Sequence, residues 1–191
     1  IRLIHDRARS APKKIVFAEA DQLDVLKAAQ IVMEEGIGQP ILLGRKDVIS
    51  DLMQSINFQE EVSILDPKSD EQLEIKSKYA NLFWNEQKRK GVTLYEAESL
   101  MRERNYFAAM MVKNGDADAM LSGYSRNYAS VIKPVLDVVG KDKGVSKIAA
   151  TNMMLTDRGP IFISDTSINI DPTAKELAKI GFMTSEIVKM F

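Results

Sequence analysis

Apolar residues along the first third of the chain fall into short runs separated by a helix-spaced stripe. The runs at 14–19 and 39–44 predict two strands. Apolar spacing at 23–33 predicts a helix between them, and Gly36 ends it. A strand, a helix and a strand in this order form a βαβ unit, which requires a parallel sheet with a right-handed crossover.

The same kind of pattern continues to about residue 140. Further helices are predicted at 46–55, 69–90, 105–114 and 128–139, and further strands at 62–65 and 119–121. In the long helix at 69–90, the side chains expected to face the core are Leu73, Tyr79, Leu82 and Phe83. Thr93 and Glu96 have the spacing of a capping box at the start of another helix. Pro134 must either kink the helix at 128–139 or lie near its true start.

The pattern changes after a turn predicted at 141–144. Strands predicted at 148–155 and 161–164 are joined by a short polar turn, which favours an antiparallel hairpin. Asp171 and Pro172 are then expected to be the N-cap and first residue of a final helix whose apolar stripe continues to Phe191. One hairpin and one helix are too small to close a core. We therefore expect a first α/β domain at 14–140 and a second, incomplete α/β domain at 141–191.

That last helix also indicates a partner. Its stripe of Leu177, Ile180, Ile187 and Phe191 would be an extended exposed apolar surface, which soluble monomers avoid. We expect another chain to cover it, in a homodimer or a larger homo-oligomer.

Composition excludes several classes of function. The 191 residues carry a net charge of −1 with the basic residues dispersed, so neither nucleic acid nor a membrane surface is an expected partner. No apolar run is long enough to span a membrane. The chain has no cysteine and one histidine, which excludes thiolate and histidine metal sites and a serine triad. We expect no metal within this chain and a cytoplasmic location.

A candidate binding segment follows the predicted strand at 119–121, which is expected to be covered on both faces. Ser122 and Gly123 stand at its carboxyl end, where loop amides and the next helix N-terminus collect ligands in open α/β sheets. Arg126 and Lys133 add positive charge beside them. This arrangement suits a phosphate or acyl-phosphate group. An ordinary strand-to-helix turn with solvated charges stays open as the alternative.

Several motifs together resemble the phosphate acetyltransferase (phosphotransacetylase) family. They are KKIVFAEADQLDVLKAAQ, EEGIGQPILLGR, GVTLYEAESLMRERNYFAAMMVKNGDADAMLSG and ISDTSINIDPTAKELAKI, and they cover nearly the whole chain. The resemblance implies two α/β domains of the isocitrate/isopropylmalate-dehydrogenase-like kind, with a cleft where acyl-CoA and phosphate meet. The family's serine- and glycine-rich segment, which carries much of the active site, would lie beyond Phe191. The catalytic residues are therefore unknown.

The chain departs from the family after its Ser-Gly pair. Acetyltransferases usually continue with a histidine and small hydroxyl residues, then an arginine before proline. Here the segment contains Arg126, Asn127 and Tyr128, with Lys133 before Pro134. The phenol of Tyr128 would occupy space that a small acyl phosphate needs, and Lys133 lacks the bidentate fork of arginine.

With these departures, with Trp84 in the long helix and with the ATNMML strand, the chain resembles the phosphotransacetylase-like C-terminal domain of bacterial NADP-dependent malic enzymes. That resemblance implies acetyl-CoA as a regulatory ligand and no cofactor within this chain. Residues 1–13 would be a linker from an upstream malic enzyme domain that binds NADP and a divalent metal and decarboxylates malate oxidatively to pyruvate. The alternatives are an active phosphate acetyltransferase and a structural or oligomerising module.

A second candidate segment lies between the predicted strand at 161–164 and the last helix. Asp165, Thr166 and Asn169 are expected near the same cleft, where they would contact the ligand. Their alternative role is structural, because Asp and Asn are favoured in turns and at helix N-termini.

Overall fold

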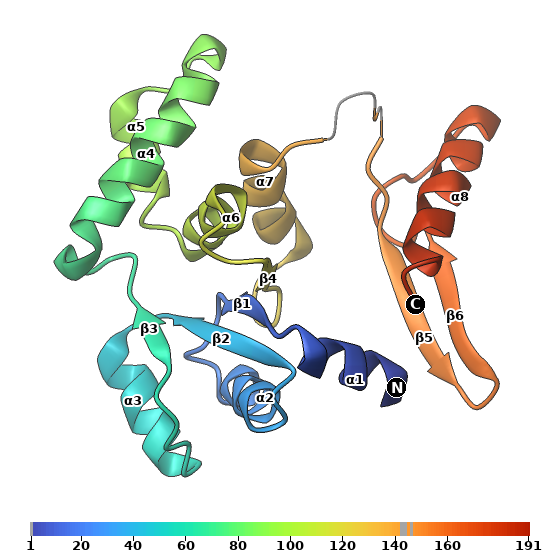
Figure 1. Cartoon of the computed structure of the whole chain (residues 1–191). Helices are drawn as coiled ribbons and strands as arrows, with labels where there is room; N and C mark the ends of the chain where they lie inside the picture. Colours follow the sequence, from blue (N-terminus) through green and yellow to red (C-terminus); the bar gives the residue numbers. More distant parts are fainter. Residues whose placement is uncertain (1, 142–144, 146) are drawn as a thin grey trace. The chain divides into compact units, whose positions relative to one another are not determined.

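The computed structural model describes residues 2–141, 145 and 147–191, and the chain divides into two compact units (Figure 1). Unit 1 is Ile1–Gly140 and unit 2 is Lys141–Phe191. Most of the turn predicted at 141–144 lies outside the described residues. No helix in the described part of the chain combines the length and apolarity needed to cross a membrane.

Unit 1 contains a parallel sheet with the strand order β3-β2-β1-β4. Its strands are β1 (Lys13–Phe17), β2 (Gly38–Leu43), β3 (Ser63–Leu65) and β4 (Ala119–Leu121). Phe17 of β1 lies in register with Leu42 of β2 on one side and with Leu121 of β4 on the other. The predicted parallel βαβ arrangement is therefore confirmed.

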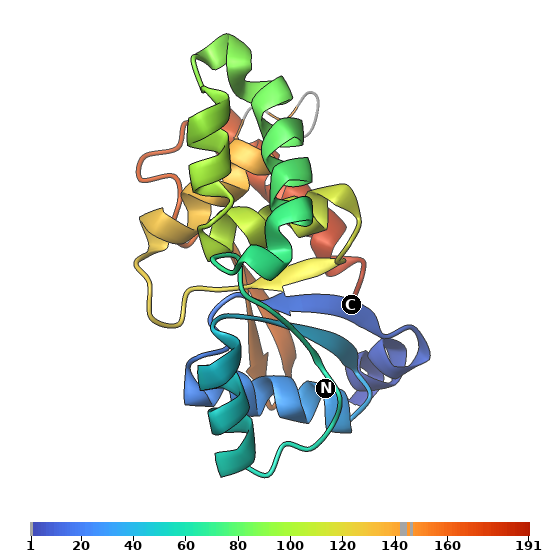
Figure 2. The same cartoon turned by 90° about the vertical axis from the view of Figure 1, so that its left-hand side faces the viewer.

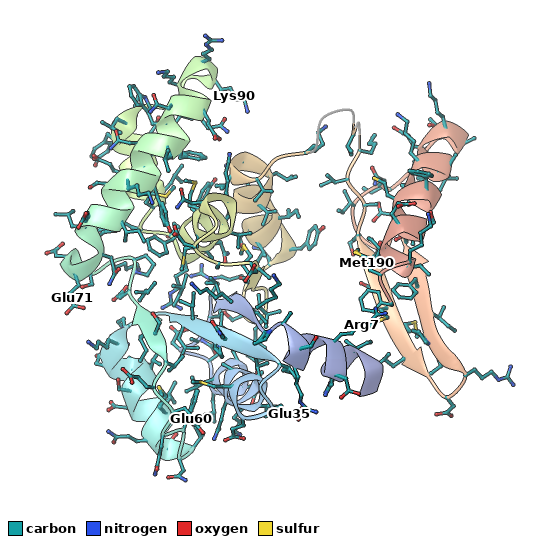
Figure 3. The ribbon with its side chains drawn as sticks, in the orientation of Figure 1. Arg7, Glu35, Glu60, Glu71, Lys90 and Met190 are labelled. Carbon is teal, nitrogen blue, oxygen red and sulfur yellow. The ribbon has the colours of Figure 1, made fainter. Side chains whose placement is uncertain are left out.

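The helices of unit 1 are α1 (Arg2–Ser10), α2 (Leu23–Glu34), α3 (Lys46–Ser55), α4 (Leu73–Gln87), α5 (Leu94–Leu100), α6 (Arg104–Asn114) and α7 (Tyr128–Val138), with short 3₁₀ turns at Asp70–Gln72 and Lys88–Lys90. The predicted Thr93–Glu96 capping box begins α5. Residues 1–13, interpreted above as a linker, contain α1. Its Arg9 donates from Nε at 2.8 Å to the carbonyl of Glu35, the residue labelled at the end of α2 in Figure 3.

Each face of the sheet has its own apolar core, because successive strand residues point to opposite sides. Phe17 and Leu42 pack on the side of α2 and α3, with Leu26 and Ile49. Val16 and Leu43 pack on the other side, against buried residues of α4, α5, α6 and α7. Figure 2 shows these two helical layers above and below the strands. Both cores anchor β1, so the residues that follow it start from a rigid support.

Two expectations for unit 1 are wrong. Strand β4 is not covered on both faces, since it lies at the end of the sheet and Leu121 is 51% exposed. In α4, Tyr79 and Phe83 are buried as predicted, but Leu73 and Leu82 are 60% and 41% exposed. The helix buries one narrow stripe, which passes through Tyr79 and Phe83, and the two leucines lie beside it.

Unit 2 is the predicted antiparallel hairpin, β5 (Thr151–Thr156) and β6 (Gly159–Ser164), followed by α8 (Ala174–Val188). Thr173, and not Asp171, is the N-cap of α8, because Thr173 and Glu176 form a complete capping box. The helix ends at Val188 and does not reach Phe191. Of its apolar stripe, Ile180 is buried, whereas Leu177 is 54% exposed.

Candidate functional site

The carboxyl ends of β1 and β4 lie side by side at a topological switch point of the sheet. From β1 the chain proceeds outward through β2 to β3, and it then returns to pair β4 with the opposite edge of β1. Loops that leave neighbouring strands in opposite directions open a crevice, where α/β proteins of this topology bind ligands. The predicted Ser122–Gly123 turn is one wall of this crevice, and the residues after β1 are the other.

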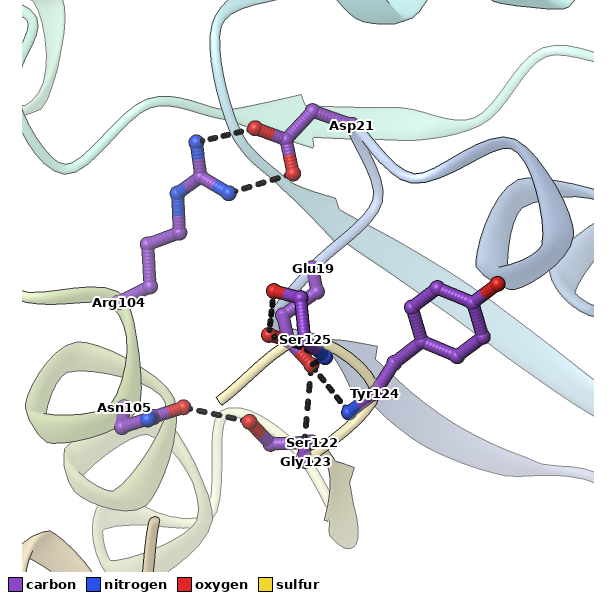
Figure 4. Close-up of polar contacts among 8 residues, drawn as sticks. All are labelled: Glu19, Asp21, Arg104, Asn105, Ser122, Gly123, Tyr124 and Ser125. Atoms are coloured by element: carbon purple, nitrogen blue, oxygen red, sulfur yellow. Dashed lines mark hydrogen bonds and ion pairs between the residues drawn. The ribbon is translucent and has the colours of Figure 1, made fainter. Parts of the chain in front are cut away.

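The carboxylate of Glu19 fills the turn that was expected to bind an anionic ligand. Its Oε2 accepts hydrogen bonds from the backbone amides of Gly123 at 2.9 Å and Tyr124 at 2.6 Å (Figure 4). Its Oε1 accepts from the Ser125 amide at 3.2 Å and from the Ser125 hydroxyl at 2.7 Å. Gly123 has φ of 104°, a conformation that favours glycine and helps the successive amides converge. The turn is an anion site whose occupant is part of the same chain.

Glu19 is ionised in this setting. Glu19 is only 5% exposed, and this burial acts to raise the pKa of its carboxyl group. The hydrogen bonds from Ser125, Tyr124 and Gly123 outweigh that effect, so its pKa lies below the usual value for glutamate. A stable negative charge therefore occupies the turn that the sequence predicted to bind an anionic ligand.

Three further contacts hold the crevice in place. Ser122 donates from Oγ to Asn105 Oδ1 at 2.7 Å, and Tyr124 donates from its hydroxyl to Asp24 Oδ2 at 2.5 Å. Arg104 and Asp21 form a bidentate ion pair with distances of 2.7 and 2.8 Å (Figure 4). These contacts connect the β1–α2 loop and the first turn of α2 with the start of α6 and the turn after β4.

Asn105 also compensates for a hydrogen bond that Pro134, which lies inside α7, cannot make. A proline at this position has no amide to donate to the carbonyl of Ser130, four residues earlier. Asn105 Nδ2 lies 3.4 Å from that carbonyl and donates to it. The helix continues to Val138, and Asn105 fastens both the loop after β4, through Ser122, and the first turn of α7, through Ser130, to α6.

Lys133 lies in a polar cluster and not at the carboxyl end of β4. Its Nζ is 2.7 Å from Asp137 Oδ2 and 3.0 Å from the Tyr106 hydroxyl, which itself donates to Asp137 at 2.6 Å. The hydrogen bonds to Asp137 and Tyr106 raise the pKa of Lys133 well above its usual range. The cation predicted to bind a ligand anion already has an anionic partner one helical turn away.

This cluster predicts unequal effects of its two charged members on stability. Asp137→Ala is expected to lower the free energy of unfolding by about 2 kcal/mol, because the Tyr106 hydroxyl and Lys133 both lose their acceptor. Lys133→Ala is expected to cost less than about 1 kcal/mol, since its side chain is 71% exposed and Tyr106 keeps its bond to Asp137. Urea unfolding of both variants measures the difference, and equal costs would contradict this account.

The other residues predicted after β4 have separate positions. Asn127 is the N-cap of α7, with its Oδ1 accepting from the Ser130 amide at 2.9 Å. Tyr128 is the first residue of α7 and is 50% exposed. Arg126 is exposed and makes no hydrogen bond or ion pair with another described residue. Of the predicted set, Arg126 is thus the cation still available to a ligand.

The second predicted segment organises its own loop in unit 2. Asp165 Oδ1 accepts from the Ala150 amide at 3.0 Å, and its Oδ2 accepts from the Asn169 amide at 2.7 Å. Asn169 Nδ2 also donates to the Ile148 carbonyl at 2.9 Å. Ser167 donates from Oγ to the hydroxyl oxygen of Thr166 at 3.4 Å. The proximity of these side chains to the cleft stays a prediction.

Glu19 is the site residue that sequence reasoning missed, because it was taken as the last residue of the first strand. The available signal was an acidic residue directly after a buried strand, opposite a glycine turn that follows a neighbouring strand. No group of three or more histidine and carboxylate side chains within the described residues is placed to hold a metal ion.

Comparisons with known proteins agree on one family. The family described as Phosphate acetyl/butaryl transferase matches residues 1–191. The NADP-dependent malic enzyme of Escherichia coli is 35% identical over 98% of this chain and 25% of its own length. The phosphate acetyltransferase of Thermoanaerobacterium thermosaccharolyticum is 32% identical over 99% of this chain and 58% of its own length.

A solved structure shares the fold. A phosphotransacetylase from Streptococcus pyogenes superposes with a TM-score of 0.80 at 30% identity, covering 95% of this chain and 56% of that protein. This chain thus spans well under two thirds of the length of each of these three relatives.

Proposed function

Because the chain belongs to the Phosphate acetyl/butaryl transferase family, we propose that this phosphotransacetylase-like domain binds acetyl-CoA as a regulator and does not transfer its acetyl group. We propose further that its parent protein is an NADP-dependent malic enzyme. An upstream domain of the parent would bind NADP and a divalent metal and decarboxylate malate oxidatively to pyruvate. The parent would be a homodimer or a larger homo-oligomer. The chain has similar sequence identity to malic enzymes and to acetyltransferases, so the choice between a regulatory domain and an active transferase depends on the chemistry of the site.

The observation that carries the proposal is the occupation of the 123–125 turn by Glu19. An acyl transfer to phosphate needs preorganised donors on the phosphate oxygens, in a geometry where a displacement of about 1 Å can cost 100-fold in rate. Here three amide donors at the switch point already bind a carboxylate, and Lys133 is paired with Asp137. A regulatory ligand needs affinity at the cleft but none of this reactive geometry.

Tyr128 supports the same choice. It begins α7 beside the turn and is half exposed, so its phenol can occupy space where a small acyl phosphate would react. The remoter nucleotide part of acetyl-CoA would still bind. Of the predicted ligand-binding residues, Arg126 and Tyr128 are the ones we propose to contact the ligand directly, with Ser122, Gly123, Asn127 and Lys133 shaping the loop. Asp165, Thr166 and Asn169 of unit 2 are proposed as further ligand-binding residues.

Two assays on the full-length parent protein test this function. We expect acetyl-CoA to change the rate of malate-dependent NADPH formation. We expect no phosphate-dependent release of coenzyme A thiol from acetyl-CoA. Thiol release at ordinary enzymic rates, about 1 s⁻¹ or faster, would establish the alternative, an active phosphate acetyltransferase. An unchanged malate rate at saturating acetyl-CoA would refute the regulatory role.

A further inference from the structure

A second feature of the switch point is a small polar hollow of about 140 Å³. Its walls come from residues that follow three strands of the sheet and from the connection into α6. Ala18 and Glu19 follow β1, Lys68 follows β3, and Ser125 and Arg126 follow β4. All three segments leave the carboxyl edge of the sheet, where ligands of open α/β sheets collect.

The charged side chains that line the hollow are not balanced by one another. Asp21 is engaged by Arg104 in the bidentate ion pair, and Glu19 is engaged by the amides of the 123–125 turn. The remaining charged lining residues are Lys68, Arg102, Glu103 and Arg126. None of these four side chains makes a hydrogen bond or ion pair with another described residue. These four lining residues are exposed, and they comprise three cations and one carboxylate.

The size of the hollow limits what it can hold. At about 140 Å³ it is smaller than the roughly 300–1,000 Å³ typical of pockets for drug-sized ligands. It has room for a few water molecules, and so for one compact group. Guanidinium groups bind phosphate through two parallel hydrogen bonds, and a lysine adds a point charge.

We propose that this hollow binds a single phosphate group through Lys68, Arg102 and Arg126. The site is distinct from the 123–125 amides, which remain occupied by Glu19. It rests on the proposed function only for the origin of the phosphate, which would be a phosphate group of bound acetyl-CoA. The hollow itself is defined by its own residues and can be tested with inorganic phosphate alone.

The first test is a titration of the 191-residue chain with inorganic phosphate, followed by ¹H–¹⁵N NMR at constant ionic strength adjusted with chloride. Saturable shifts are expected at the amides of Ser125 and Arg126. Arg102→Ala and Arg126→Ala should each weaken phosphate binding about tenfold or more, since each removes a charge-assisted contact. Lys27→Ala on the exposed surface of α2 removes the same charge elsewhere and should leave the affinity unchanged.

A variant that binds phosphate more tightly is a useful control, because misfolding could explain a loss of affinity but not a gain. Glu103→Gln removes the unpaired carboxylate of the hollow and is expected to tighten phosphate binding several-fold. Absence of saturable, phosphate-specific shifts in the unmodified chain would overturn the proposal. So would an equal loss of affinity in Lys27→Ala, which would indicate a non-specific charge effect.

Acetyl-CoA titrated into the full-length parent separates this proposal from the proposed function. Failure of acetyl-CoA to bind would refute the function while phosphate binding to the hollow still stood. Acetyl-CoA binding that Arg102→Ala and Arg126→Ala leave unchanged, together with no phosphate binding, would refute the hollow and the proposed contact of Arg126 with the ligand, and it would leave the regulatory role of acetyl-CoA standing.

Discussion

Glu19→Ala is expected to lower the free energy of unfolding of unit 1 by about 3 to 5 kcal/mol. Three backbone amides and one hydroxyl lose their shared acceptor in a region where Glu19 itself is only 5% exposed. Each of these hydrogen bonds is partly buried and has a charged acceptor, so each is expected to contribute about 1 kcal/mol or more. The loop after β4 should also lose its fixed position against β1.

Urea unfolding followed by circular dichroism measures this cost. Glu60→Ala is the matched control, since Glu60 is exposed in the α3–β3 connection and has no hydrogen-bond partner among the described residues (Figure 3). It should change the free energy of unfolding by less than about 0.5 kcal/mol. A cost for Glu19→Ala as small as that of the control would show that the turn does not depend on the carboxylate.

The contribution of Glu19 should depend on pH in a defined direction. Its pKa is lowered in the folded chain, so the ionised form stabilises the fold at any pH above the unfolded value of about 4.3. This stabilisation is lost as pH falls through the lower, folded pKa. The difference in stability between the unmodified chain and Glu19→Gln should therefore be constant near neutral pH and shrink below about pH 4.

Local features of the fold were predictable because their causes lie within a few residues. The apolar runs located the strands of the parallel sheet, and Thr93 with Glu96 located the start of α5. The wrong cap at Asp171 has a local cause too. Asp171 and Thr173 are both good N-cap residues, and the Glu176 carboxylate three residues after Thr173 favours the latter. That signal was present in the sequence.

The occupant of the candidate site was not predictable in the same way. Glu19 and the amides it binds are 104 to 106 residues apart, and no local pattern connects them. The pairing of Lys133 with Asp137 is different, because four residues separate them on one helix, and that spacing alone indicates an ion pair. Polar residues at strand ends therefore located the crevice in the sequence. Which charged side chains remain available to a ligand depends largely on tertiary contacts, which the sequence does not show.

Unit 2 shows the same use of an internal carboxylate. Its hairpin and helix bury few side chains, with Ile180 the large apolar residue that is almost fully covered within the described part of the unit. Asp165 accepts from the amides of Ala150, Ser167, Ile168 and Asn169, and these bonds join the start of the hairpin to the loop before α8. They hold its pKa well below the usual range for aspartate despite burial, which acts in the opposite direction.

Asp165→Ala is accordingly expected to release this loop. Because four amide donors lose their shared acceptor, hydrogen exchange at the Ala150 and Asn169 amides should accelerate about 100-fold or more, as measured by ¹H–¹⁵N NMR on the whole chain. Asp157→Ala in the turn between β5 and β6 is the matched control, because Asp157 is exposed and has no partner among the described residues. Its exchange rates at the same two amides should stay within about twofold of the unmodified chain. Unchanged protection in Asp165→Ala would remove the structural role of this carboxylate and favour the ligand-binding role predicted from the sequence.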